Sequence, residues 1–344
     1  MPQYERVVDG VCRGIVVVTG ASGHIGANLV RALVAQGRPV RALVHADRRA
    51  LAGVDCSQVE GDVRDVASLR RACAGAEVAY HLAAHISLLM TDWPYVEQIN
   101  VQGTRNVVDA CLSSGVRRLV HFSSIQAFQQ APLDETLDET RPLVESLDAP
   151  PYDRSKAASE RVVREGIARG LDAVILNPTC VIGPHDFRPS LFGEALVSIV
   201  RGRMPALVKG GFDWVDARDV AECALRAERL APSGAQYIVA GHWASIRDLA
   251  DVAGRMRAVQ VPWFVCPLGL VRAAAPFAVA WARLRGERPT FTSVMVHALQ
   301  GNRLVSDARA RRDLGYQPRA FESTLADTLR WFAAQGLLDP IAGQ

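Results

Sequence analysis

The first half of this chain alternates short apolar runs with segments of helical period. Apolar runs occupy residues 14–19, 39–45, 78–82, 118–123 and 173–177, and a shorter one lies at 58–61. Segments of helical period separate them at 25–36, 66–73, 96–112 and 152–168. Strands that are apolar on both faces and alternate with helices are typical of a parallel sheet covered on each side. We therefore predict an α/β fold with a doubly wound parallel sheet.

The second half is patterned differently. Beyond Gly183 the sequence breaks into Pro-rich and Gly-rich pieces, with helical segments at 191–201, 217–230, 246–258 and 324–334. We predict a Rossmann domain formed by residues 1–180 plus about 213–240. A smaller, mostly helical C-terminal substrate lobe would contain about 181–212 and 241–344.

Composition excludes several classes of function. The 344 residues are 49% hydrophobic, which allows a large core, and the net charge of +3 comes from 39 basic and 36 acidic residues mixed along the chain. Because no basic block is present, we do not expect a nucleic-acid partner. The seven cysteines form no CxxC pair, and the first ten residues lack the apolar core of a secretory signal. We expect a cytoplasmic protein with reduced thiols.

Residues 263–284 are the one stretch whose hydrophobicity suggests a membrane. Arg272 lies at its centre, and Pro267 and Pro276 interrupt it, so it is poorly suited to a spanning helix. We predict no transmembrane segment but a pair of short apolar helices in the substrate lobe, with a peripheral membrane contact as the alternative.

Three glycines follow the first predicted strand and open the first predicted helix. Gly20, Gly23 and Gly26 stand in the segment TGASGHIG, which begins at Thr19. In this setting glycines allow a tight turn, close approach of the backbone to a pyrophosphate, and close packing of helix on strand. The unpaired amides at the helix N-terminus attract the anion. The segment predicts a dinucleotide site.

The end of the second predicted strand bears on which dinucleotide is bound. An acid at the strand tip favours NAD, whereas cations favour the 2′-phosphate of NADP. The tip carries His45 and no acid, and Arg48 and Arg49 follow within a turn, although Asp47 could still turn toward a ribose. We favour NADP over NAD on local charge alone. Asp62, after the third strand, is expected near the adenine amine.

Tyr152 and Lys156 are four residues apart on a predicted helix, so their side chains share one face. A nearby ammonium and the positive nicotinamide ring both favour the phenolate, which would make Tyr152 a usable acid or base. Only two of the 39 basic residues are lysines. A lysine kept in so arginine-rich a chain indicates a role for a compact ammonium on a flexible stem.

Other polar residues are expected close to this pair. Ser124 follows the strand at 118–123 and could donate to a substrate carbonyl oxygen. Asn100 lies within a predicted helix and is a candidate to hold a water behind Lys156, or else a simple capping residue. His81 and His85 lack a nearby acidic third ligand, so we expect no metal site.

Together these residues resemble the extended short-chain dehydrogenase/reductase family over most of the chain. The segments that carry the resemblance also include HLAA after the fourth strand, NPTCVIGP after the sixth and VDARDVA from Val215. Within that family the chain is most similar to dihydroflavonol reductases, hydroxysteroid dehydrogenases and bacterial epimerase/dehydratase-like proteins.

The resemblance implies roles for individual residues. It implies a catalytic set of Ser124, Tyr152 and Lys156, assisted by Asn100. The cofactor residues we predict from the motifs and the resemblance are Gly20, Ser22, Gly23, His24, Ile25, Gly26, His45, Arg48, Arg49, Asp62, Val63, Leu82, Ala83, Ala84, Pro178 and Thr179. NADP-dependent reductases of this branch commonly have arginine where this chain has His45, which argues against NADP. A homodimer is possible for the family.

An apolar pocket wall is expected from Ile86, Met90, Gln126, Phe128, Phe187 and Trp214. Such a wall favours a hydrophobic ketone, aldehyde or alcohol over a sugar diphosphate. We therefore predict reversible carbonyl reduction. The alternatives are a nucleotide-sugar epimerase or dehydratase with tightly bound NAD, and a dinucleotide sensor without catalysis. Sugar-nucleotide epimerases usually have Arg-Pro-x-Asn where this chain reads Asn177-Pro178-Thr179-Cys180.

Overall fold

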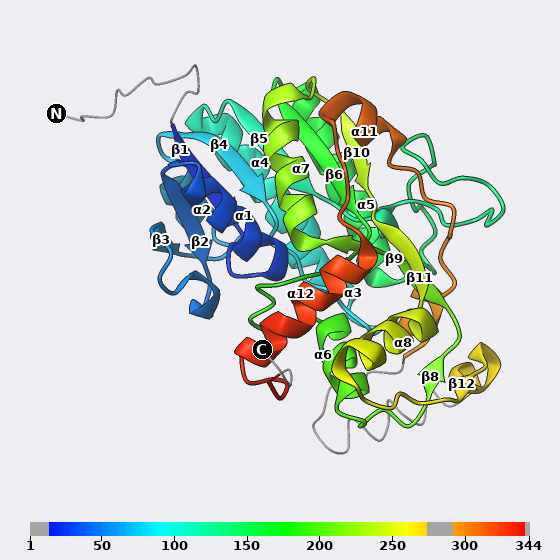
Figure 1. The fold of residues 1–344 in the computed structure, drawn as a ribbon. Coiled ribbons are helices and arrows are strands. Elements are labelled where there is room, and N and C mark those ends of the chain that lie inside the picture. Colours follow the sequence, from blue (N-terminus) through cyan, green and yellow to red (C-terminus); the bar gives the residue numbers. More distant parts are fainter. Residues whose placement is uncertain (1–13, 274–291, 341–344) are drawn as a thin grey trace.

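A single parallel sheet of seven strands organises the molecule, which we describe from a computed structural model over residues 14–273 and 292–340 (Figure 1). The order is β10-β6-β5-β4-β1-β2-β3, and each neighbouring pair is parallel. The strands are β1 (Ile15–Thr19), β2 (Val40–Val44), β3 (Ser57–Glu60), β4 (Ala76–His81), β5 (Arg118–Phe122), β6 (Ala173–Pro178) and β10 (Gln236–Val239). The predicted doubly wound sheet is confirmed. The strand β10 was not predicted, although its residues lie within the range assigned to this domain.

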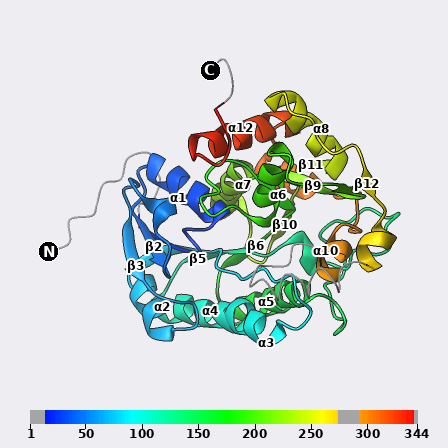
Figure 2. The ribbon, with the colours of Figure 1, turned by 90° about the horizontal axis from the view of Figure 1, so that it is seen from below.

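Helices cover both faces of the sheet. One face is covered by α1 (His24–Ala35) and α7 (Ala217–Leu230), and the other by α2 (Val66–Cys73), α4 (Gly103–Ser114) and α5 (Pro151–Ala168) (Figure 2). Alternate residues of β1 explain this arrangement. Val16 and Val18 are buried in the core beneath α1, whereas Val17 is buried in the opposite core. The sheet is therefore apolar on both faces, as the sequence indicates.

The helix predicted at 96–112 is longer and less regular than expected. It begins with α3 (Trp93–Val96), continues through a π-helical segment (Glu97–Gln102), and ends with α4. Wide turns of this kind often occur at functional residues, because they displace one side chain from the regular helical register. Asn100 lies in the wide turn and is buried.

A second hydrophobic core forms the C-terminal lobe. A small sheet of order β11-β9-β7 comprises β7 (Cys180–Ile182), β9 (Gly211–Asp216) and β11 (His242–Ser245). A second pair joins β8 (Leu207–Val208) to β12 (Val265–Cys266). The helices of this lobe are α6 (Leu191–Val200), α8 (Ile246–Arg257), α10 (Ser293–Ala298) and α12 (Phe321–Ala334). The lobe therefore contains two small sheets in addition to its helices. The division of the chain into these two domains stays a prediction.

One helix near the C-terminal end packs on the large sheet. We assigned residues 241–344 to the substrate lobe, but α11 (Ala308–Leu314) packs on α7 and β10. Ala310 and Leu314 are buried in the core of the large sheet, and the hydroxyl of Tyr316 donates to the carbonyl of Ala240 at 2.7 Å. The buried residues of α11 thus extend the core between α7 and the large sheet.

The apolar stretch at 263–284 is described only in part. Residues 274–284 lie outside the described residues, and 263–273 contain β12 and a short helical turn at 268–273. Among the residues that the structure describes, no helix is both long and apolar enough to cross a bilayer.

Candidate active site

The glycine loop lies at the carboxyl end of β1, next to the end of β4. Strand order reverses between these two strands, and ligands of doubly wound sheets bind in the crevice at such a point. Gly20 has a φ of +68°, and a Cβ there would lie 2.6 Å from the amide nitrogen of Ala83. A Cβ on Gly26 would overlap the carbonyl oxygen of Gly20. Both positions therefore require glycine.

The start of α1 is open to an anion. Gly23 is its N-cap residue, no side chain caps the helix, and its first turn contains no acid. An uncapped helix N-terminus facing a glycine turn is suited to a pyrophosphate. The ring of His24 points elsewhere, since its Nε2 lies 3.1 Å from the carbonyl oxygens of both Gly183 and Pro184. His24 thus ties the glycine loop to the segment that follows β7.

The predicted nucleotide residues lie around this crevice. Val63 is buried, with Leu82 and Ala83 half-buried and Ala84 exposed after β4. Pro178 closes β6, and the hydroxyl of Thr179 donates to Asp213 at 2.7 Å. The glycine turn, where a Cβ would clash, and the uncapped start of α1 together fit the pyrophosphate of a dinucleotide. The role of each remaining residue, Ser22 and Ile25 included, stays a prediction.

Charged pairs surround the end of β2. Arg49 forms a two-point ion pair with Asp47, with a shortest distance of 2.6 Å, and Arg48 lies 3.1 Å from Glu60. The Arg49 guanidinium lowers the pKa of Asp47 to about 2. His45 lies 3.6 Å from Asp62, whose carboxylate accepts from Arg64. Both arginines are more than half exposed, so these pairs are weak and exchangeable.

The catalytic residues meet at the carboxyl edge of β5. Ser124 is the second residue after the end of β5, and its hydroxyl oxygen accepts the backbone N–H of Gln126 at 3.2 Å. Tyr152 and Ser124 are hydrogen-bonded through their side chains. The Lys156 ammonium lies 5.9 Å from the Tyr152 ring centroid. The structure therefore brings the three predicted catalytic residues together.

Burial shifts both proton-carrying groups. It raises the pKa of Tyr152 to about 12, with the hydrogen bond from Ser124 opposing the shift. Burial lowers the pKa of Lys156 to about 8, and the charge of Glu160 opposes that shift. At neutral pH the phenol is thus protonated and the lysine mostly charged. The raised pKa of Tyr152 is opposite to the lowered value that we predict from the nearby ammonium, because burial outweighs that charge here.

A buried polar cluster supports Ser124 from behind and was not predicted. The Asn177 amide nitrogen donates to the Ser124 carbonyl at 3.0 Å and to Glu160 at 2.6 Å. The Gln236 amide donates to both Glu160 and Asn177 at 2.9 Å. Burial raises the pKa of Glu160, and Ser123 and Asn177 oppose that shift by hydrogen bonding. The signal in the sequence was Glu160, four residues after Lys156 on the same helix face.

Asn100 is engaged differently from the prediction. Its amide donates to the carbonyl of His85 at 3.0 Å and to the hydroxyl of Ser155 at 2.8 Å, while its oxygen accepts the N–H of His85 at 2.7 Å. Ser155 in turn donates to the carbonyl of Tyr152 at 2.7 Å. Asn100 therefore couples the loop after β4 to the catalytic helix, and its water-holding role stays a prediction.

Two histidines are buried behind the same helix. His81 lies between the hydroxyls of Thr19, at 2.7 Å, and Thr104, at 3.0 Å. Burial and the charge of Lys156 lower its pKa to about 3. The His121 ring lies 5.3 Å away. His85 packs against Tyr95 instead, and within the described part of the chain no group of His, Cys, Asp and Glu could hold a metal ion.

Three of the predicted substrate residues pack against other side chains in this structure. Phe128 is 1% exposed in a small core with Leu137, and Trp214 is 3% exposed in the core of the C-terminal lobe, its indole N–H donating to Ala244. Phe187 packs on Trp331 and Arg31, between α12 and α1. Large aromatic residues fill cores more often than they line sites, and the sequence pattern could not separate the two. The burial of Phe128 and Trp214 does not support their assignment to a pocket wall, and the role of Phe187 stays a prediction.

Ile86, Met90 and Gln126 remain as candidate substrate residues. Ile86 and Met90 are 58% and 46% exposed on the loop after β4. The side-chain oxygen of Gln126 is buried without a hydrogen-bond partner, two residues from Ser124. A buried amide oxygen in that position is available to a ligand.

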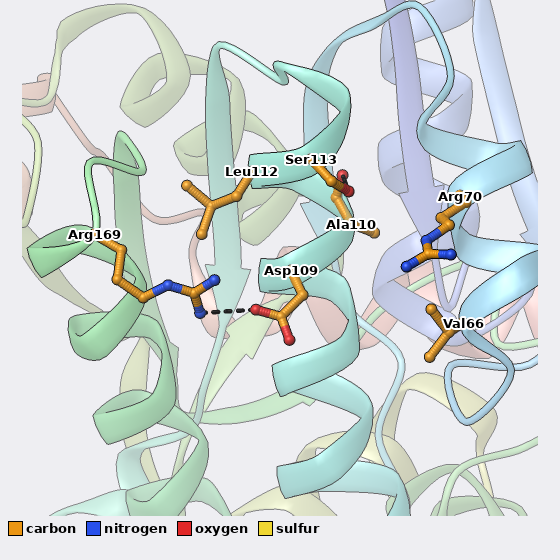
Figure 3. A pocket seen from close by; sticks show the side chains of 7 residues that line it. All are labelled: Val66, Arg70, Asp109, Ala110, Leu112, Ser113 and Arg169. Carbon is orange, nitrogen blue, oxygen red and sulfur yellow. Dashed lines mark hydrogen bonds and ion pairs between the residues drawn. The ribbon is translucent and has the colours of Figure 1, made fainter.

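A groove of about 480 Å³ lies elsewhere, on the outer side of the helix layer (Figure 3). Its walls come from α2, α4 and the end of α5, and the ion pair between Arg169 and Asp109 crosses it at 2.7 Å. None of the predicted site residues lines it. We therefore place the candidate active site at the sheet edge and not in this groove.

Known proteins resemble this chain over nearly its whole length. The model of the NAD dependent epimerase/dehydratase family matches residues 16–240. Sterol demethylase protein B of Methylococcus capsulatus is 36% identical over 94% of this chain and 99% of its own length. A 3-beta-hydroxysteroid dehydrogenase of Mycolicibacterium neoaurum is 27% identical over 96% of this chain and 94% of its own.

Solved structures show the same fold. The crystal structure of gox2253 is 30% identical, with a TM-score of 0.82 over 94% of this chain and 99% of that one. A double mutant of DesIV, a dTDP-glucose 4,6-dehydratase from Streptomyces venezuelae with NAD bound, is 24% identical, with a TM-score of 0.77 over 95% and 99%. The chain thus belongs to the NAD dependent epimerase/dehydratase family, within the extended short-chain dehydrogenase/reductases, and is an oxidoreductase of CH–OH and C=O groups.

Proposed function

We propose that this enzyme interconverts a hydrophobic ketone or aldehyde and its alcohol with NAD(P). The observation that carries the proposal is the meeting of Ser124, Tyr152 and Lys156 at the carboxyl edge of β5. The glycine loop that would hold the dinucleotide lies on the same edge, at the end of β1. The proton donor, Tyr152, and the dinucleotide that would supply the hydride would therefore lie in one crevice.

The dinucleotide, when bound in its reduced form, supplies the hydride to the carbonyl carbon. Tyr152 donates its phenolic proton to the carbonyl oxygen, so that one hydride and one proton complete the alcohol. The hydroxyl of Ser124, which hydrogen-bonds Tyr152 in this structure, would turn its hydrogen to the substrate oxygen once the substrate is bound. The ammonium of Lys156 stabilises the phenolate that remains. Oxidation of the alcohol reverses each of these transfers.

The substrate we propose is hydrophobic. Ile86 and Met90 present exposed apolar side chains beside the crevice, and the relatives named above are a sterol demethylase protein and a hydroxysteroid dehydrogenase. The buried oxygen of Gln126 could accept one hydroxyl of such a substrate. Cys180 stands where nucleotide-sugar enzymes usually have asparagine, which disfavours a sugar diphosphate.

For the cofactor we propose NADP in preference to NAD. Arg48 and Arg49 follow β2. The carboxylate of Asp47 is paired with Arg49 and is therefore less available to accept hydrogen bonds from ribose hydroxyls. A 2′-phosphate could replace the exposed carboxylate partners of both arginines, because exposed ion pairs contribute little.

A turnover screen with the purified protein tests the proposal. We expect oxidation of NADPH with a steroidal, aromatic or long aliphatic ketone, and a smaller rate with NADH. Arg49→Gln should weaken NADPH binding more than NADH binding. Turnover confined to nucleotide sugars, or a purified protein that retains NAD tightly, would contradict the proposal.

A further inference from the structure

The C-terminal lobe exposes a cluster of large apolar side chains on one short segment. Trp263 is 84% exposed, Phe264 42% and Leu270 60%. The rings of Trp263 and Phe264 lie 5.9 Å apart. The segment includes β12 and lies at the outer edge of the lobe, far from the large sheet (Figures 1 and 2). Single exposed apolar residues are ordinary, but three on one short segment form a patch that marks a contact.

The two stretches of chain that meet at this patch contain cations and no acids, and Asp251, which lies close by, is paired with Arg247. Residues 195–212 and 252–273 contain no aspartate or glutamate. Pairing of β8 with β12 brings the two stretches together, since the Leu207 N–H donates to the Phe264 carbonyl at 3.0 Å and the Lys209 N–H to the Cys266 carbonyl at 3.1 Å. Exposed cations of these stretches include Arg201, Arg203, Lys209 and Arg272.

These four cations are not neutralised within the protein. None of them forms an ion pair with any residue in 14–273 or 292–340. Arg272 donates only to the neutral amide of Gln300 at 2.8 Å. The nearby α10 and the residues up to Ser306 also contain no acid. The patch therefore combines exposed apolar side chains with cations that no carboxylate in the described part of the chain pairs.

This combination selects one kind of partner. A second copy of the chain would place cation against cation across a two-fold axis, which opposes association. An anionic lipid surface satisfies both features, because tryptophan prefers the interfacial region and lysine and arginine are drawn to anionic headgroups. We propose that Trp263, Phe264, Leu270 and these four cations, together the Trp263 surface, rest on an anionic lipid membrane. For residues 263–273 this replaces the buried helix pair that the sequence pattern favours.

Sedimentation of the full chain with large vesicles tests the proposal. We expect binding to an equal mixture of phosphatidylcholine and phosphatidylglycerol, little binding to phosphatidylcholine alone, and weakening by salt. Trp263→Ser should lower partitioning about tenfold, as expected for one large apolar side chain withdrawn from lipid. Arg203→Gln and Lys209→Gln should each lower it about fivefold.

Matched variants separate the surface from general hydrophobicity. Leu230→Ser and Leu147→Ser change side chains that are 60% and 78% exposed elsewhere, and both should bind vesicles as the unchanged protein does. Thermal unfolding monitored by circular dichroism checks that every variant is folded. Absence of sedimentation with the anionic vesicles would overturn the proposal. So would a dimer, detected by light scattering, that Trp263→Ser converts to a monomer, because the surface would then be an interface between copies.

Discussion

The Lys156 ammonium donates a 2.8 Å hydrogen bond to the carbonyl oxygen of Phe122. Phe122 is the last residue of β5, and Ser123 and Ser124 follow it. This bond fixes the catalytic face of α5 to the end of the strand from which the catalytic serine departs. The lysine thus has a structural anchor in addition to its charge, and its ionisation should be visible in both stability and activity.

The free energy of unfolding should depend on pH because Lys156 is buried. Burial lowers the pKa of this lysine from 10.5 to about 8, so between these values the unfolded chain binds a proton that the folded protein does not. The free energy of unfolding should therefore rise by up to about 3 kcal/mol as the pH increases from about 8 to 10.5, relative to Lys156→Met. Urea unfolding of both proteins across this range measures the difference. If the free energies of unfolding of the two proteins changed equally with pH, burial would not lower the pKa of Lys156.

Activity should fall at high pH, where Lys156 loses its proton. We expect kcat/KM for carbonyl reduction to fall above about pH 8, the pKa to which burial lowers this lysine. Steady-state rates at several pH values, with cofactor saturating, give the profile. A flat profile beyond pH 10 would contradict a role for the ammonium.

Glu160→Gln should shift the fall in kcat/KM to lower pH. The carboxylate of Glu160 raises the pKa of Lys156 against the larger effect of burial, so its removal should lower this pKa further. The amide oxygen can still accept from Asn177, whereas the amide nitrogen would face the Gln236 donor, so thermal unfolding checks that the variant is folded. Glu165→Gln is the matched control, because Glu165 is exposed on the same helix and pairs with Arg105. A shift of equal size in both variants would indicate a nonspecific effect.

The glycine loop should discriminate between two alanine substitutions. A Cβ at Gly26 would overlap the backbone of Gly20, whereas one at Gly23 would lie 3.2 Å from the same carbonyl, a distance that a small shift relieves. Gly26→Ala should cost about 1–3 kcal/mol of stability or cofactor affinity, and Gly23→Ala clearly less. Thermal unfolding and fluorescence titration with NADPH measure the two effects. Equal losses would argue against the close approach at Gly26.

Much of the fold followed from local pattern. The helices at 66–73 and 217–230 were predicted with the bounds observed, because periodic apolar residues and flanking cap residues such as Asp65 and Asp216 determine them locally. The strand β10 escaped prediction because four residues carry too little periodicity, and its neighbour β6 lies far earlier in the chain.

The site divides in the same way. Tyr152, Lys156 and Ser124 could be predicted because helix spacing and the strand end place them locally. Phe128 and Trp214 could not be assigned from sequence, since an aromatic residue in a core and one in a pocket have the same local signal. The contacts of Asn177 with Glu160 and Ser124 depend on packing of α5 beside β6, which no local pattern shows.

The central claim is that Tyr152 transfers the proton at a site whose cofactor lies on the glycine loop. Tyr152→Phe removes only the phenolic hydroxyl, so turnover with NADPH and a responsive ketone should fall by about 10²–10⁴-fold or more. The affinity for NADPH, measured by fluorescence titration, should remain nearly unchanged. Retained turnover in this variant would contradict the account.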